Sequence, residues 1–174
     1  MEEKKEIKIT IQRQGKSELD YSRSLEELKE IHKERMERIK AGEKQLATLE
    51  FAMLAYAIDC VNWVKKSFSI DLDLEEGSLL QFQNVLENAQ AAIKKGALPK
   101  ERIDSFLKLF GGYYGALILH NLGGEWVQSS IGPAVEIGTR HAFVMTCIVK
   151  FLNSGAEDES CIGFYGRFKD ACSK

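Results

Sequence analysis

No other part of the chain limits its fold as strongly as the apolar run from Phe51 to Val64. Its residues, FAMLAYAIDCVNWV, are apolar on nearly every side of a helix, and only Asp59 and Asn62 interrupt them. A segment that spans a bilayer needs about 20 apolar residues, so this run is too short for that purpose. A helix that is hydrophobic all round is normally surrounded by other elements. We therefore expect residues 43–68 to form the central helix of a globular domain.

Three further helices are expected to surround this central one. Residues 21–40 carry a thin apolar stripe typical of a surface helix, and Ser22 or Ser24 can provide its N-cap. Residues 75–95 repeat apolar side chains at spacings of three and four, with glutamines and asparagines on the outer face. Residues 99–121 begin with a proline, which suits the first turn of a helix. The sequence thus predicts a mainly helical domain.

Gly111, Gly112 and Gly115 fall inside the helix expected at residues 99–121. A glycine in a helix interior costs about 0.5–1 kcal/mol relative to alanine, so three of them need an explanation. Either a neighbouring element packs against the backbone where no Cβ intervenes, or the helix breaks at this point. Close packing is the simpler explanation, and we favour it.

The apolar pattern changes from helical to alternating after residue 124. Weak alternation over residues 125–137, interrupted by turn residues, predicts a small antiparallel hairpin. An isolated hairpin is only marginally stable, so it must pack against helices or gain a third strand. The alternating isoleucines of residues 7–11 are the candidate for that strand. The otherwise polar residues 1–20 are therefore expected to be a polar arm or an edge strand.

The C-terminal region is expected to add one or two more helices. Residues 142–152 are apolar and suit either a strand or a helix, and the basic residue near their end together with the Asn-Ser-Gly ending favours a helix. Asp158 or Ser160 can cap a last helix. The expected fold class is α+β and predominantly helical, with one domain over residues 21–174 and the hairpin packed on its helices.

Composition excludes several classes of protein. Lys and Arg number 24 and Asp and Glu number 26, so the formal net charge of -2 provides no basic surface for nucleic acid. The charged N-terminus has no apolar export signal behind it, which leads us to expect a cytoplasmic protein. The four cysteines are Cys60, Cys147, Cys161 and Cys172. They form no CxxC pair, so we expect reduced thiols, no metal site, no cofactor and no membrane association.

Motifs for catalysis are not evident in the sequence. It contains no P-loop, dinucleotide-binding glycine motif, zinc-protease histidine pair or nucleophile elbow. The histidines, His32, His120 and His141, are scattered and are interpreted mainly as structural. Aromatic and polar residues gather instead around the end of the helix at 99–121, where Tyr and Trp can anchor a recognition surface. These candidate binding residues are Tyr113, Tyr114, His120, Asn121, Glu125 and Trp126.

A second candidate site involves Asp59 and Asn62 on the central helix. Buried polar groups are costly unless they are hydrogen-bonded. These two residues therefore either bond to a neighbouring helix or line a pocket between the central helix and the hairpin. In the pocket interpretation, Asp59, His120 and Glu125 would be the acid–base groups.

The run from Gly111 to Val127, GGYYGALILHNLGGEWV, carries a family resemblance. It resembles the Gly-x-Tyr-x-Gly-Glu-x(5-7)-Gly-Gly-x-Trp signature of small bacterial domains of unknown function of the DUF3806 type, over about residues 100–170. The resemblance implies a helix that ends in Gly-Gly, a strand that begins near Trp126, a second strand and a helical tail. Ala116 stands where the signature has Glu, so any role of that carboxylate is lost here. Some such domains lie among toxin–immunity genes, which is an analogy at the level of the fold.

Two functions remain open from the sequence. The first is a non-enzymatic interaction module that holds a protein partner, of the immunity type. The alternative is a small-ligand binder or enzyme with a pocket between the central helix and the hairpin. Either could also be a homo-oligomer in which the stripe of the helix at 21–40 pairs with a second copy.

Overall fold

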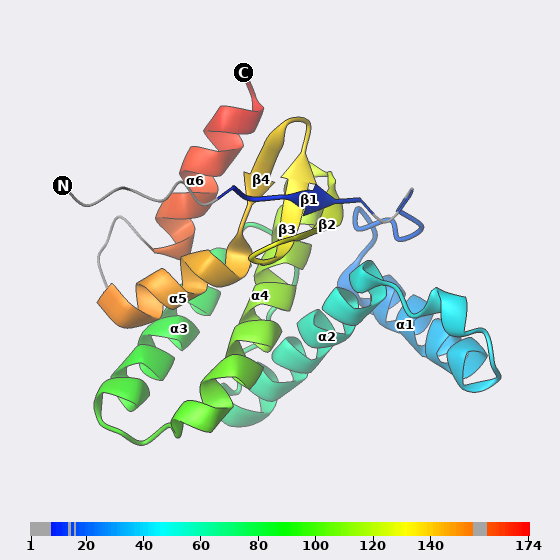
Figure 1. Ribbon diagram of the computed structural model, residues 1–174. Helices are drawn as coiled ribbons and strands as arrows, with labels where there is room; N and C mark the ends of the chain where they lie inside the picture. The colour runs from blue at the N-terminus through cyan, green and yellow to red at the C-terminus, as the bar shows by residue number, and fades with distance from the viewer. Residues whose placement is uncertain (1–7, 14, 16, 155–159) are drawn as a thin grey trace.

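The computed structural model describes residues 8–13, 15, 17–154 and 160–174, and it confirms a predominantly helical α+β fold (Figure 1). The helices of this part of the chain are α1 (Leu25–Lys40), α2 (Leu49–Phe68), α3 (Ser78–Lys94), α4 (Lys100–Leu122), α5 (Val144–Ser154) and α6 (Cys161–Cys172). The strands are β1 (Ile11–Gln12), β2 (Glu125–Ser129), β3 (Gly132–Ile137) and β4 (Arg140–Ala142). They form one antiparallel sheet in the order β1-β2-β3-β4.

Residues 110–119 of α4 are all buried, so α4 is the most enclosed helix, and the expected central position of residues 43–68 is not met. Helix α2 packs against α4 on one side and α1 on another. It runs alongside α4, and its buried side chains include Leu54, Ala57 and Val64, each fully enclosed (Figure 1). The helix begins later than residue 43 because residues 44–46 form a short 3-10 turn. Thr48 then caps α2, and its side chain accepts a hydrogen bond from a backbone N–H of the first turn.

Helix α4 is continuous, and close packing explains its glycines. Gly111 faces Met145 of α5, Gly112 faces Tyr56 of α2, and Gly115 faces the ring of Trp126 in β2. A Cβ placed on Gly112 would lie 2.6 Å from the Cβ of Tyr56, a separation that real side chains do not tolerate. The absence of three methyl groups therefore lets α2, α5 and β2 all approach the backbone of α4. The close-packing interpretation is confirmed.

The expected hairpin is present, and its connection is short. Ser129 of β2 pairs with Gly132 of β3, so only residues 130–131 form the loop. The Ser129 hydroxyl donates to the carbonyl of Gly132 at 2.6 Å and accepts from the N–H of Ile131 at 3.2 Å. These two hydrogen bonds of the Ser129 side chain stabilise the tight turn.

Strands on both sides of the hairpin complete the sheet. Ile11 pairs with Ser129, which gives the hairpin a third strand; Ile7 of the expected alternation lies outside the described residues. On the other side, β4 pairs with β3 and ends at Ala142. This strand was not predicted, because its three residues are too few to show alternation.

The C-terminal helices follow β4. The helical interpretation of residues 142–152 is confirmed by α5. Ser160 caps α6 by accepting from a backbone N–H, whereas the other candidate cap, Asp158, lies outside the described residues. Gln83 of α3 departs from expectation, since it is buried and its side-chain oxygen accepts from the N–H of Cys161 at 3.0 Å.

Helix α1 lies at the edge of the molecule, beyond α2 (Figure 1). Of its two expected caps, Ser24 forms the cap, in a reciprocal capping box with Glu27. The stripe residues Leu25 and Leu28 are buried within the chain, Leu28 completely. This part of the stripe is therefore covered by the protein's own core and does not offer a face for a second copy.

Candidate functional site

The aromatic candidates from the sequence are core residues. Tyr113 and Tyr114 have no exposed surface, and Trp126 is 5% exposed. The Tyr113 hydroxyl donates to the carbonyl of Asp73 at 2.6 Å, and the Tyr114 hydroxyl donates to the carbonyl of Cys161 at 2.7 Å. Burial raises the pKa of both tyrosines, so both remain neutral donors. A recognition surface cannot be built from these rings, because their tips tie a loop and a helix to α4.

His120 and Asn121, at the end of α4, also hold neighbouring segments. The Nδ1 atom of His120 lies 2.7 Å from the carbonyl oxygen of Tyr21, and since a carbonyl only accepts, Nδ1 carries the proton. Its Nε2 lies 3.2 Å from the Glu75 carboxylate. Asn121 donates to the carbonyl of Leu74 at 2.7 Å. The two side chains thus fix the segment before α1 and the loop before α3.

Asp59 and Asn62 are exposed, so the expectation that they are buried polar groups is wrong. The structural reason is that one side of α2 faces solvent, and Ala52, Lys66 and the end of the helix are exposed along with these two residues. Neither residue is among the described residues that line a pocket near the hairpin. The structure therefore does not bring Asp59 into a common site with Glu125.

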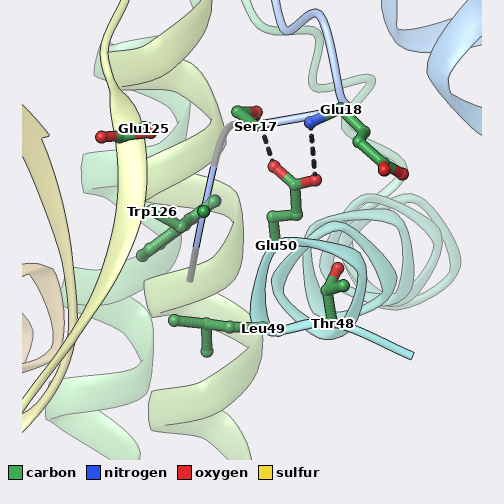
Figure 2. A pocket seen from close by; sticks show the side chains of 8 residues that line it. Ser17, Glu18, Thr48, Leu49, Glu50, Glu125 and Trp126 are labelled. Atoms are coloured by element: carbon green, nitrogen blue, oxygen red, sulfur yellow. Dashed lines mark hydrogen bonds between the residues drawn. The ribbon is translucent and has the colours of Figure 1, made fainter. Parts of the chain in front are cut away.

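A small cavity does lie between the start of α2 and strand β2, close to the predicted pocket (Figure 2). Among its lining residues are Ser17, Glu50, Glu125 and Trp126. The Glu50 carboxylate accepts hydrogen bonds from the Ser17 hydroxyl at 2.6 Å and from the N–H of Glu18 at 3.0 Å. The side chain of Glu125 points away from Glu50 (Figure 2). The cavity measures about 70 Å³, well below the roughly 300 Å³ of the smaller small-molecule pockets. Its carboxylate serves to hold the N-terminal segment on α2.

Trp126 takes part in the same attachment. Its ring N–H donates to the Tyr21 hydroxyl at 3.2 Å, and that hydroxyl donates to the carbonyl of Glu50 at 3.2 Å. The segment before α1 is therefore joined to β2 and to α2 by a buried chain of hydrogen bonds. The buried ring N–H of Trp126 thereby has a hydrogen-bond partner.

A much larger groove lies between β4, α5 and α6. Its volume is about 630 Å³, within the range of 300–1,000 Å³ typical of small-molecule pockets. The described residues that line it are His141, Phe143, Thr146, Cys147, Lys150, Phe164 and Arg167. Two aromatic rings provide apolar surface, and a histidine, a lysine and an arginine provide positive or potentially positive charge. None of these lining residues is acidic.

His141 joins this groove to a buried carboxylate. Its Nε2 lies 2.6 Å from Glu136 in the adjacent strand β3. Arg13 holds the same carboxylate through two bonds of 2.7 Å, from Nε and Nη2. The bonds from Arg13, and secondarily those from His141, lower the pKa of Glu136 although burial opposes them. Because an ionised carboxylate only accepts, Nε2 of His141 carries a proton and Nδ1 is the ring nitrogen left for other contacts.

Sequence reasoning did not identify this groove. His141 was noted only as a scattered histidine, and Lys150 and Arg167 are far apart in sequence. Their convergence depends on β4, a strand too short to leave a pattern, and on how α6 packs against α5. A positively charged residue one helical turn after Cys147 was the only local signal of a charged pocket.

Two further properties bear on the kind of site. Among the described residues, no three His, Cys, Asp or Glu side chains are grouped so that they could hold a metal ion. In the same part of the chain, no helix has the length and apolar character needed to cross a membrane.

Comparisons of the chain with protein-family models, with curated proteins and with solved structures found no match. The functional argument therefore depends on the geometry of the groove and the residues that line it.

Proposed function

We propose that this domain binds a small anionic molecule with an apolar body in the groove between β4, α5 and α6. The observation that supports the proposal is the composition of the lining. Lys150, Arg167 and His141 line the groove together with the rings of Phe143 and Phe164. A carboxylate joined to a hydrocarbon or aromatic group matches both parts of this surface.

Of the two functions left open by the sequence, this proposal favours the small-ligand binder over the protein-interaction module. The aromatic anchors expected for a protein partner are buried. The proposed ligand site lies beside strand β4, next to the hairpin, and not between α2 and the hairpin. There Glu136 holds His141 in a fixed orientation, and fixed polar groups raise affinity because less freedom is lost on binding.

Isothermal titration with decanoate tests the proposal. We expect decanoate to bind with one-to-one stoichiometry, decanol to bind more weakly, and inorganic phosphate without an apolar body not to bind measurably. Lys150→Glu and Arg167→Glu should each weaken decanoate binding by about tenfold or more, the effect of removing one charged partner.

The matched control is Lys66→Glu, the same charge reversal at an exposed position on α2. This variant should bind decanoate like the wild type. The proposal fails if the wild type does not bind decanoate, or if all three charge reversals weaken binding equally.

A further inference from the structure

Two cysteine thiols meet where α5 packs against α6. The side chain of Cys161, the first residue of α6, is hydrogen-bonded to that of Cys147 in α5. Both thiols also lie close enough to the Tyr114 hydroxyl to affect it electrostatically. This contact brings together two cysteines that are separated in sequence, and the proposed ligand binding does not require it.

The two cysteines differ in access to solvent. Cys161 has no exposed surface, and its backbone is fixed by Gln83, which accepts from its N–H, and by Tyr114, which donates to its carbonyl. The hydrogen bond with Cys147 and burial raise the pKa of Cys161, so it stays a thiol. Cys147 is 7% exposed and lines the groove. A small oxidant that enters the groove therefore meets Cys147 first.

Two basic residues line the same groove as Cys147. Lys150 follows Cys147 by one turn on the same face of α5, and Arg167 lines the groove from α6. Positive charge near a cysteine favours the thiolate, which is the form that attacks peroxides.

We propose that Cys147 and Cys161 are a peroxide-sensitive thiol pair that forms a disulfide between α5 and α6. The Cys147 thiolate attacks one oxygen of hydrogen peroxide, the O–O bond breaks, and the products are a sulfenic acid and hydroxide. The Cys161 sulfur then attacks the sulfenic sulfur as its proton passes to the sulfenic oxygen; the S–S bond forms, the S–O bond breaks and water leaves. Overall, two thiols are oxidised and one peroxide is reduced to two waters.

Peptide mapping by mass spectrometry tests the pair directly. The folded protein is treated with hydrogen peroxide, denatured, alkylated and digested with trypsin. Cleavage after Arg140, Lys150 and Arg167 gives peptides 141–150 and 151–167, which contain one cysteine each. We expect these two peptides to be joined, the number of alkylated cysteines to fall from four to two, and dithiothreitol to restore all four.

Three variants assign the roles of the two cysteines. Cys161→Ser should stop at the sulfenic acid of Cys147, which dimedone traps. In Cys147→Ser, the remaining cysteines should stay reduced at the same peroxide dose. Cys172→Ser, which alters a more exposed thiol of α6, should form the same disulfide as the wild type.

The proposal is overturned if the wild type retains four alkylated cysteines, or if the joined peptides contain a different pair. The wild-type mapping needs no variant to fold, and it is independent of whether the groove binds decanoate.

Discussion

Gly115 sets the distance between α4 and the sheet. A Cβ at this position would overlap the ring of Trp126. Alanine would gain about 1 kcal/mol of helix propensity, but overpacking a filled core costs about 1–3 kcal/mol or more. We expect Gly115→Ala to lower the free energy of unfolding in urea. Gly166→Ala in α6 is the control, because open space surrounds that glycine, and it should stabilise by about 0.5–1 kcal/mol. A Gly115→Ala variant whose free energy of unfolding equals or exceeds that of the wild type would contradict the packing argument.

His32 should make stability depend on pH. Its ring stacks on Phe51 with centroids 4.7 Å apart, and its Nε2 is buried without a hydrogen-bond partner among the described residues. Burial lowers the pKa of His32, although the charge of Asp59 opposes this. The unfolded chain therefore binds a proton more readily than the folded one. Stability should fall as the pH drops through about 6.5, the ordinary histidine value, toward the lower folded pKa.

The variant His32→Leu keeps the apolar contact with Phe51 and removes the titrating group. We expect it to be more stable than the wild type at pH 5.5, and its advantage should shrink at pH 8. Thermal unfolding at the two pH values measures this difference. An equal advantage at both values would show that protonation of His32 is not involved.

At the scale of elements, Glu136 connects three strands. It lies in β3, accepts two bonds from Arg13 just beyond β1, and accepts one from His141 in β4. Its pKa is lowered in the folded state, so its contribution to stability is present above the ordinary carboxyl range. That contribution is lost as the pH falls through the folded pKa.

Replacing Glu136 by Gln should loosen β1 and remove this acid-side loss of stability. We expect faster hydrogen exchange at the amides of residues 11–12 at neutral pH. Glu125→Gln is the matched control, since Glu125 lies directly opposite Glu136 in β2. Because Glu125 attracts Arg13 by charge alone and less strongly than Glu136 does, this variant should change that exchange far less. Equal exchange in the two variants would contradict the role of Glu136.

Sequence patterns predicted long elements better than contacts between them. The apolar run of α2, the proline start of α4 and the serine before α6 each depend on short-range rules, and the structure confirms the helices they indicate. The candidate site was harder to predict than the helices. The sequence alone does not show whether a tyrosine or tryptophan lies on the surface as a binding anchor or inside the core. Long-range contacts decide it: Phe82 of α3 packs against both Tyr113 and Tyr114, and Phe164 of α6 packs against Tyr114.

At the scale of the whole molecule, the short edge strands limit the pairing of sheets between copies. Strand β1 has two residues and β4 has three, so each outer edge of the sheet offers few backbone groups to another chain. The same shortness hid β4 from sequence analysis, whereas the alternating isoleucines of residues 7–11 indicated β1. The groove lies beside β4, so its position in the fold could not be predicted either.

The glycines of α4 also have a consequence for the order of folding. Together they remove about 2–3 kcal/mol of intrinsic helix stability, so α4 is a weak helix before its neighbours arrive. Helix nucleation is itself unfavourable, and residues 100–122 should be largely unstructured as an isolated peptide. We therefore expect α4 to become stably helical only once α2, α5 and β2 have closed on its backbone.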